Sequence, residues 1–255
     1  MLARRAAAEA LGTGTLVAAV VGSGIMAARL STDVLLQLLV NAAATVAVLA
    51  VLIAVLGPVS GAHFNPAVTL VEAAGGDLRP GEATAYVSAQ VVGGLAGVGV
   101  ANLMFDLPAY EPSRHTRTGV GLWLGEVVAT AGLLLVIAAL TRTGRGRLGP
   151  LLVPAWIGGA YFFTASTSFA NPAVTVARAW SDTFAGIAPA SVPAFLAAQA
   201  VGAVLGASLA VVLFPRAAAV RLDLPEPVAD PDGQPVEQVP PDPRRHPSPR
   251  HRPAR

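Results

Sequence analysis

The residues best suited to contact a small molecule are two copies of Asn-Pro-Ala-Val-Thr, at 65–69 and 171–175. Asparagine is a favoured N-cap and proline fits the first helical position, so each copy predicts a helix start. Two helix starts that face each other aim two positive dipole ends at one point, and each asparagine amide still offers N–H donors. Such a site suits neutral molecules with lone pairs and repels cations. The candidate constriction consists of Asn65, Pro66, Ala67, Asn171, Pro172 and Ala173.

Two acidic residues, Glu9 and Glu126, interrupt stretches that are otherwise almost free of charge. Placing a carboxylate inside a membrane costs free energy, so its presence indicates a structural or functional role. The two glutamates are either proton relay groups or acceptors for backbone N–H groups of irregular loops, and we favour the second interpretation. Gln90 and Gln199 allow the same two interpretations. His63 precedes the first Asn-Pro-Ala by two residues and is either a protonation gate or, as we favour, a hydrogen-bonded loop histidine.

The composition excludes a water-soluble class of protein. Hydrophobic residues make up 54% of the 255 positions and charged residues only 13%, about half the usual quarter. The chain has no cysteine, which excludes disulfides, thiolate metal sites and thiol catalysis. Arginines are scattered and form no basic stripe with aromatic residues, so no nucleic-acid partner is expected. The sequence predicts a protein embedded in a lipid bilayer, with no cofactor and no metal.

Two uncharged runs, 34–71 and 148–177, are each too long for one membrane-spanning helix and too short for two with a loop. Each run divides into a full span followed by a half-span. The full spans are 34–56, ended by Gly57-Pro58, and 150–169; the half-spans are 65–74 and 171–180. With the remaining apolar runs, the sequence predicts an all-α membrane protein of six transmembrane helices and two re-entrant half-helices.

The two halves of the chain repeat each other, at about 6–105 and about 118–215. Besides the duplicated pentapeptide, Ala89-Gln90-Val91-Val92-Gly93 recurs as Ala198-Gln199-Ala200-Val201-Gly202. Because each half has three spans, an odd number, the second half must begin from the opposite side of the membrane. The pattern predicts an inverted 3+3 repeat with its site near the midplane.

Arginine bias predicts that both termini are cytoplasmic, because eight arginines fall on that side and four on the other. We expect the protein in the plasma membrane. Residues 1–221 form the predicted channel domain. Residues 222–255 are rich in proline, aspartate and arginine and are expected to be a disordered cytoplasmic tail. As an alternative, residues 1–28 are a secretory signal, but the match between Glu9 and Glu126 would then lose its meaning.

The segment Ser60-Gly61-Ala62-His63-Phe64-Asn65-Pro66-Ala67-Val68-Thr69 resembles the first signature loop of the aquaporin and aquaglyceroporin (major intrinsic protein) family. The second Asn-Pro-Ala, the two glutamates and the two glutamines also fall where that family has them. The resemblance covers roughly residues 6–215. It implies one pore per subunit, a homotetramer, passive conduction of water or small uncharged solutes, and glutamates that hold the re-entrant loops.

The chain departs from the family at the selectivity filter. Aquaporins usually carry an arginine directly after the second Asn-Pro-Ala, and this chain has Val174 there. Counting from the family pattern places the other filter positions at Thr45, Gly159 and Ser168. This set has neither a ring nor a charge, so the sequence predicts a wide filter that lacks the arginine.

The favoured function is a passive channel for small uncharged solutes such as glycerol-like polyols, urea or metalloid hydroxides, arsenous acid among them, and for water. A water-selective aquaporin is the first alternative. A proton-coupled secondary transporter, with Glu9 or Glu126 as the coupling group, is the second. An enzyme fits poorly, because no nucleophile lies in a pattern with a base.

Overall fold

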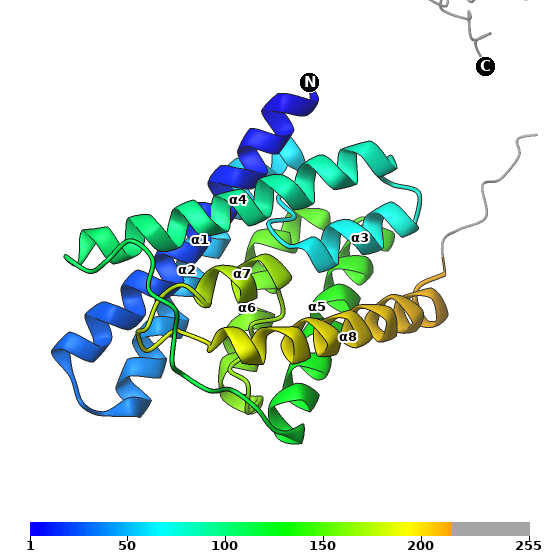
Figure 1. Ribbon diagram of the computed structural model, residues 1–255. Coiled ribbons are helices and arrows are strands. Elements are labelled where there is room, and N and C mark those ends of the chain that lie inside the picture. The colour runs from blue at the N-terminus through cyan, green and yellow to red at the C-terminus, as the bar shows by residue number, and fades with distance from the viewer. Residues whose placement is uncertain (216–255) are drawn as a thin grey trace, which may run out of the picture. The chain divides into compact units, whose positions relative to one another are not determined.

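The computed structural model describes residues 1–215, and these residues form helices and connecting loops without a strand. In Figure 1 the helices form a bundle in which α3 and α7 are much shorter than their neighbours. The helices are α1 (Leu2–Leu30), α2 (Val34–Ser60), α3 (Pro66–Ala74), α4 (Pro80–Met104), α5 (Val120–Arg142), α6 (Gly149–Phe163), α7 (Pro172–Arg178) and α8 (Val192–Leu213). Two single 3₁₀ turns, η1 (Gly146–Leu148) and η2 (Pro189–Ser191), precede α6 and α8.

The all-helical membrane architecture predicted from the sequence is confirmed, with two corrected boundaries. Helix α2 continues through Gly57 and Pro58 to Ser60, and ends where Gly61 adopts a left-handed conformation, with φ of 90°. Helix α6 ends at Phe163, so the span predicted to reach residue 169 is wrong. The polar run that follows Phe163 forms the loop before α7 instead. Within residues 1–215, five helices are long and apolar enough to cross a membrane by themselves: α1, α2, α4, α5 and α8 with η2.

Matching pairs of helices from the two repeats pack through glycines. A side-chain carbon at Gly93 of α4 would lie 2.1 Å from the carbonyl oxygen of Ala10 in α1. In the second repeat, a side-chain carbon at Gly206 of α8 would lie 2.4 Å from the carbonyl oxygen of Ala131 in α5. Neither glycine can therefore be replaced without separating the helices, which is the close approach that small residues permit in lipid.

The polarity of the bundle suits hydrocarbon surroundings. Glu9, Gln90, Glu126 and Gln199 are fully buried in its interior. Large apolar side chains are exposed on the outside of the helices, among them Val51, Val55, Val204, Val211 and Val212. This is the arrangement expected when lipid surrounds the protein and polar groups must be satisfied inside it. Helix α1 is part of this bundle, because it packs along α4 and α2.

The two short helices bring the centres of the two repeats together. Helix α3 packs against α4 and α8, and α7 packs against α1, α4 and α8. The two also contact each other, so the duplicated pentapeptides, 106 positions apart in the chain, become neighbours. The predicted tail at 222–255, and the last residues of the predicted channel domain, lie outside the described residues.

Candidate functional site

The two predicted helix starts form as the sequence indicates. The side-chain oxygen of Asn65 accepts a hydrogen bond from the backbone N–H of Ala67 at 2.9 Å, and Pro66 occupies the first turn of α3. The side-chain oxygen of Asn171 accepts from Ala173 N–H at 3.0 Å and from Val174 N–H at 3.3 Å. Each cap uses the side-chain oxygen of its asparagine as the acceptor, so the side-chain amide nitrogen can donate to another group.

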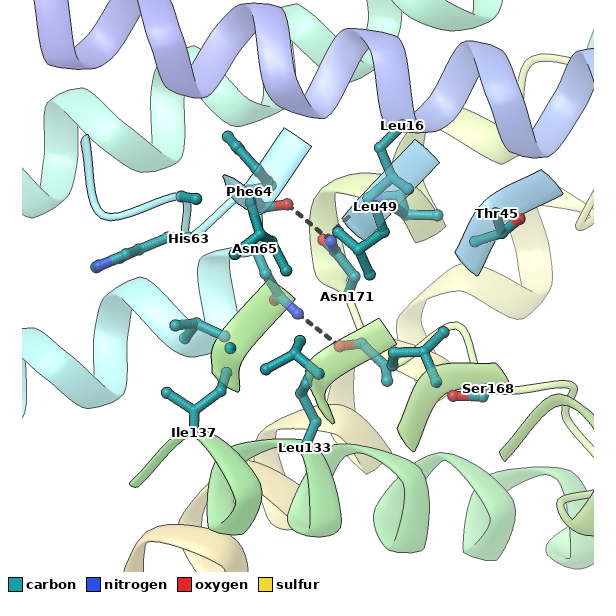
Figure 2. A pocket seen from close by; sticks show the side chains of 18 of the residues that line it. Leu16, Thr45, Leu49, His63, Phe64, Asn65, Leu133, Ile137, Ser168 and Asn171 are labelled. Carbon is teal, nitrogen blue, oxygen red and sulfur yellow. Dashed lines mark hydrogen bonds between the residues drawn. The ribbon is translucent and has the colours of Figure 1, made fainter. Parts of the chain in front are cut away.

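The amide nitrogens tie the two repeats to each other. Asn65 Nδ2 donates to the carbonyl oxygen of Ala170 at 2.7 Å, and Asn171 Nδ2 donates to the carbonyl oxygen of Phe64 at 2.8 Å, as Figure 2 shows. An amide nitrogen carries two hydrogens, so each asparagine keeps one N–H beyond this cross-link. Both asparagines line a cavity of about 340 Å³. The structure therefore places two N–H donors side by side in a cavity wall.

The cavity has one apolar side and one polar side. The polar side consists of the two asparagines and the loops that precede them, residues 61–64 and 168–170. The apolar side comes from the long helices and consists of Leu16, Val20, Leu49, Ile53, Leu133, Ile137, Val153 and Ile157. Because the cavity also reaches His63 in one direction and Thr45 in the other, it passes the asparagine pair on both sides. We refer to these as the His63 end and the Thr45 end.

Glu9 holds the loop before α3. Its Oε1 accepts from Ser60 Oγ at 2.6 Å and from His63 N–H at 3.1 Å. Its Oε2 accepts from Phe64 N–H and from Gln90 Nε2, both at 2.7 Å. Four donors satisfy this buried carboxylate, which is the arrangement that a loop-supporting role requires.

Glu126 does the same for the loop before α7. Its Oε1 accepts from Phe169 N–H at 2.9 Å, and its Oε2 accepts from Ala170 N–H at 2.9 Å and from Gln199 Nε2 at 2.6 Å. Gln199 Nε2 also donates to Thr175 Oγ1 at 2.8 Å, as Gln90 Nε2 does to Thr69 Oγ1 at 2.9 Å. The glutamines thus connect each glutamate to its half-helix.

Both loops hold strained backbone next to the asparagines. Ala62 and Phe64 have φ of 54° and 48°, and Ser168 and Ala170 have φ of 51° and 45°. Residues other than glycine rarely adopt such values, and each costs on the order of 1–3 kcal/mol. The buried glutamates accept the backbone N–H groups of Phe64 and Ala170. The hydroxyl oxygens of Ser60 and Ser166 accept those of Ala62 and Ser168, at 3.1 and 3.3 Å. The result is a rigid polar side in the cavity.

Three of the four predicted filter residues line the Thr45 end. Thr45, Ser168 and Val174 are all buried and contribute to the cavity wall. Ser168 Oγ is buried and has no hydrogen-bond partner within residues 1–215. Thr45 Oγ1 donates to the carbonyl oxygen of Asn41 at 2.8 Å, so an oxygen lone pair remains for another partner.

The prediction for Gly159 is wrong. The residues of α6 that line the cavity are Gly149, Val153, Ile157 and Tyr161, which are spaced by four and so share one face. Gly159 lies halfway between Ile157 and Tyr161 in the sequence and therefore on another face of the helix. Tyr161 takes its place, and its hydroxyl lies 3.3 Å from Thr45 Oγ1. The filter therefore contains a ring that the count from the second Asn-Pro-Ala did not find.

The expectation that the filter residues at the Thr45 end of the cavity include no charge is also wrong. Arg178, the last residue of α7, is 3% exposed and lines the cavity together with Phe169. Its guanidinium carbon lies 3.4 Å from the centre of the Phe169 ring. The sequence carried a signal for this position, since Arg178 follows Val174 by four residues and so shares its face of α7.

His63 lies at the opposite end of the cavity and is held on three sides. Its Nδ1 lies 3.1 Å from Thr69 Oγ1, and its backbone N–H donates to Glu9. Its ring meets the edge of the Tyr86 ring, with centroids 5.4 Å apart. Tyr86 in turn donates its hydroxyl to the carbonyl oxygen of Ser60 at 2.7 Å. These contacts fit a loop histidine that borders the cavity.

Comparison with known proteins agrees with this geometry. Residues 1–170 match the Major intrinsic protein (MIP) family. The chain is 54% identical over 208 residues to "Aquaglyceroporin AqpS" of Rhizobium meliloti (strain 1021), covering 82% of this chain and 89% of that relative. It is 34% identical over 169 residues to "Aquaporin Z" of Photorhabdus laumondii, covering 61% of this chain and 71% of the relative.

A solved structure shares the fold. The X-ray structure of the aquaglyceroporin from Plasmodium falciparum superposes with a TM-score of 0.61 at 23% identity, covering 82% of this chain and 95% of that one. The family match extends over more than half of the chain, and the Rhizobium relative over more than four fifths of it. With its two capped half-helices joined through their asparagines, the chain belongs to the major intrinsic protein family.

Proposed function

We propose that the chain is a passive membrane channel for small uncharged solutes with several hydroxyl or amide groups, and that it also passes water. The observation that carries this proposal is the two-sided cavity around the asparagine pair. A polyol can turn its oxygens toward the N–H donors of Asn65 and Asn171 while its carbon chain contacts the apolar side. The name of the Rhizobium relative, an aquaglyceroporin, supports solutes of this size.

The residues at the Thr45 end favour solutes larger than water. Val174 is short and apolar, so it leaves more room than a long charged side chain would. Ser168 Oγ lacks a partner, and Thr45 and Tyr161 add two more hydroxyls. These groups suit glycerol-like polyols, urea and metalloid hydroxides such as arsenous acid, which is neutral at pH 7 and bears three hydroxyl groups.

The proposal is tested by flux into proteoliposomes that contain the purified full chain. Shrinkage followed by re-swelling in glycerol, urea or arsenous acid separates solute flux from water flux. We expect all three solutes to enter faster than in protein-free liposomes. A protein that passes water but none of these solutes would be a water-selective aquaporin, and the proposal would fail.

A proton-coupled transporter is the main rival, and the contacts of the glutamates argue against it. Glu9 and Glu126 accept four and three hydrogen bonds respectively, and neither contributes to the cavity wall beside the asparagine pair except through the loops that it holds. A relay group must gain and lose a proton without dismantling its surroundings. We expect flux that is independent of a proton gradient and not saturated at high solute concentration.

We further propose a plasma-membrane homotetramer with both chain ends on the cytoplasmic side. The arginine bias supports the orientation. The chain has no cysteine, so a single cysteine introduced at Arg4 or at Arg114 reports sidedness without background. A membrane-impermeant thiol reagent applied to intact cells should label the cysteine at 114 and not the one at 4. Chemical cross-linking in membranes tests the tetramer.

A further inference from the structure

Arg178 lines the cavity one helical turn from Val174. Both residues line the cavity and lie on one face of α7. Four residues of helix rise about 6 Å, so the charge is displaced along the cavity from the position of Val174. Val174 thus sets the width of the cavity at its own position, and Arg178 sets the position of the charge beyond it.

The guanidinium of Arg178 is fixed in place. Its Nε donates to the carbonyl oxygen of Ala185, in the loop between α7 and η2. Its planar group rests on the ring of Phe169, with the guanidinium carbon 3.4 Å from the ring centre. A side chain pinned by a hydrogen bond and by a cation–π contact keeps its charge at one point of the wall.

The two terminal nitrogens of Arg178 remain available. Within residues 1–215, Nε is the atom of this guanidinium that has a hydrogen-bond partner. The acidic residue that interacts with Arg178 electrostatically, Glu126, is already occupied by three N–H donors. A second guanidinium, that of Arg117, lies 5.2 Å from the centre of the same Phe169 ring but is not part of the cavity wall.

We propose that Arg178 is a specificity-determining residue: it supplies the fixed positive charge that keeps protons and metal cations out of the channel, and it donates N–H groups to passing solute oxygens. A cation in a narrow, poorly solvated passage is repelled by a fixed charge far more strongly than in water. This division leaves the width of the filter to Val174 and the exclusion of cations to Arg178. The inference rests on the proposed channel function.

The test compares cation flux with glycerol flux in proteoliposomes of the full chain. Arg178→Met removes the charge, and we expect the ratio of proton or potassium flux to glycerol flux to rise about tenfold or more, which corresponds to about 1.4 kcal/mol. Arg178→Lys keeps a charge and should return the ratio to within about threefold of the unsubstituted protein. Arg178→Gln, which keeps an N–H for the oxygen of Ala185, carries the test if Arg178→Met does not fold.

Arg117→Met is the matched control. Arg117 stacks on the same ring and holds the same loop through the carbonyl oxygens of Gly186 and Phe184, but it does not line the cavity. If loop disorder caused the leak, Arg117→Met would leak as well, and the inference would be overturned. It would also be overturned by Arg178→Met protein that passes glycerol with unchanged cation flux. An unsubstituted protein that passes no uncharged solute would instead refute the proposed channel function.

Discussion

Asn65 and Asn171 hold each other's loops: each donates its side-chain amide to the carbonyl oxygen of the residue that directly precedes the other. The exchange joins two helices whose starts are separated by about a hundred residues of chain. It fixes both N–H pairs at one level of the cavity. The position of the constriction is therefore a property of the pair.

Substituting Asn171 by aspartate should damage both stability and selectivity. The change places a carboxylate oxygen against the carbonyl oxygen of Phe64, so a hydrogen bond is lost and two acceptors face each other. The expected loss of stability is about 1–3 kcal/mol, and the new negative charge should admit cations. Thermal unfolding in detergent and cation flux in proteoliposomes measure the two effects.

Asn102→Asp provides the comparison for that experiment. Asn102 is buried and donates to the carbonyl oxygen of Ala109 at 3.0 Å, but it does not line the cavity. It should lose stability without gaining cation flux. Equal cation flux in both variants would contradict a constriction at the asparagine pair.

Replacing Glu126 by glutamine should lower stability and flux without introducing dependence on a proton gradient. The amide group presents N–H groups where the N–H groups of Phe169 and Ala170 need an acceptor. The expected cost is about 1–3 kcal/mol, from a buried donor left unsatisfied. Glu82→Gln, which removes the negative charge from a partly exposed ion pair with Arg5, should cost no more than about 1 kcal/mol. Glycerol flux measured with and without an imposed pH difference decides the matter. If the gradient drives uptake in the unsubstituted protein and not in Glu126→Gln, the loop-supporting role is refuted.

Val174→Arg should reduce the flux of glycerol more than the flux of water. The long side chain would enter the cavity one turn before Arg178 and narrow it, and water is small enough to pass. Val174→Leu separates width from charge, because it adds volume without a charge. Stopped-flow light scattering gives both fluxes from one preparation. Equal fractional losses for the two permeants would show that Val174 does not set the width.

Gly93→Ala should prevent correct packing of α1 against α4. Its new carbon would lie 2.1 Å from the carbonyl oxygen of Ala10, a distance that no small adjustment relieves. We expect a loss of stability of about 2 kcal/mol or more, the scale of an overpacked core.

Gly81→Ala in the same helix is the control, because the new carbon has nothing within 4 Å of it. It should be neutral or stabilising by up to about 1 kcal/mol, because alanine favours the helix. Fluorescence-detected gel filtration after heating compares them, and similar midpoints would be inconsistent with this contact.

Much of the architecture follows from the sequence, because local signals and composition act over short distances. Two Asn-Pro pairs fix the starts of α3 and α7, since the cap and the first helical position are chosen by neighbouring residues. Long apolar stretches with few charges predict membrane helices by length alone. The match between Glu9 and Glu126 likewise points to equivalent positions in the two repeats, and their contacts are equivalent.

The tertiary structure alone decided which side chains meet at the Thr45 end. Counting back from the second Asn-Pro-Ala selected Gly159, but α6 ends at Phe163 and turns Tyr161 toward Thr45. A count from the second Asn-Pro-Ala crosses the loop between α6 and α7, so the length and path of that loop decide which residue of α6 faces the cavity, and no local pattern reports them. Arg178 is an intermediate case, because its spacing of four from Val174 gives its face of α7 but not its burial. Its charge suggests an exposed loop, yet the Phe169 ring and the carbonyl oxygen of Ala185 draw it into the wall. Both partners come from the loops on either side of α7, and the loop before α7 takes its shape from the contact of Phe169 with Glu126 in α5.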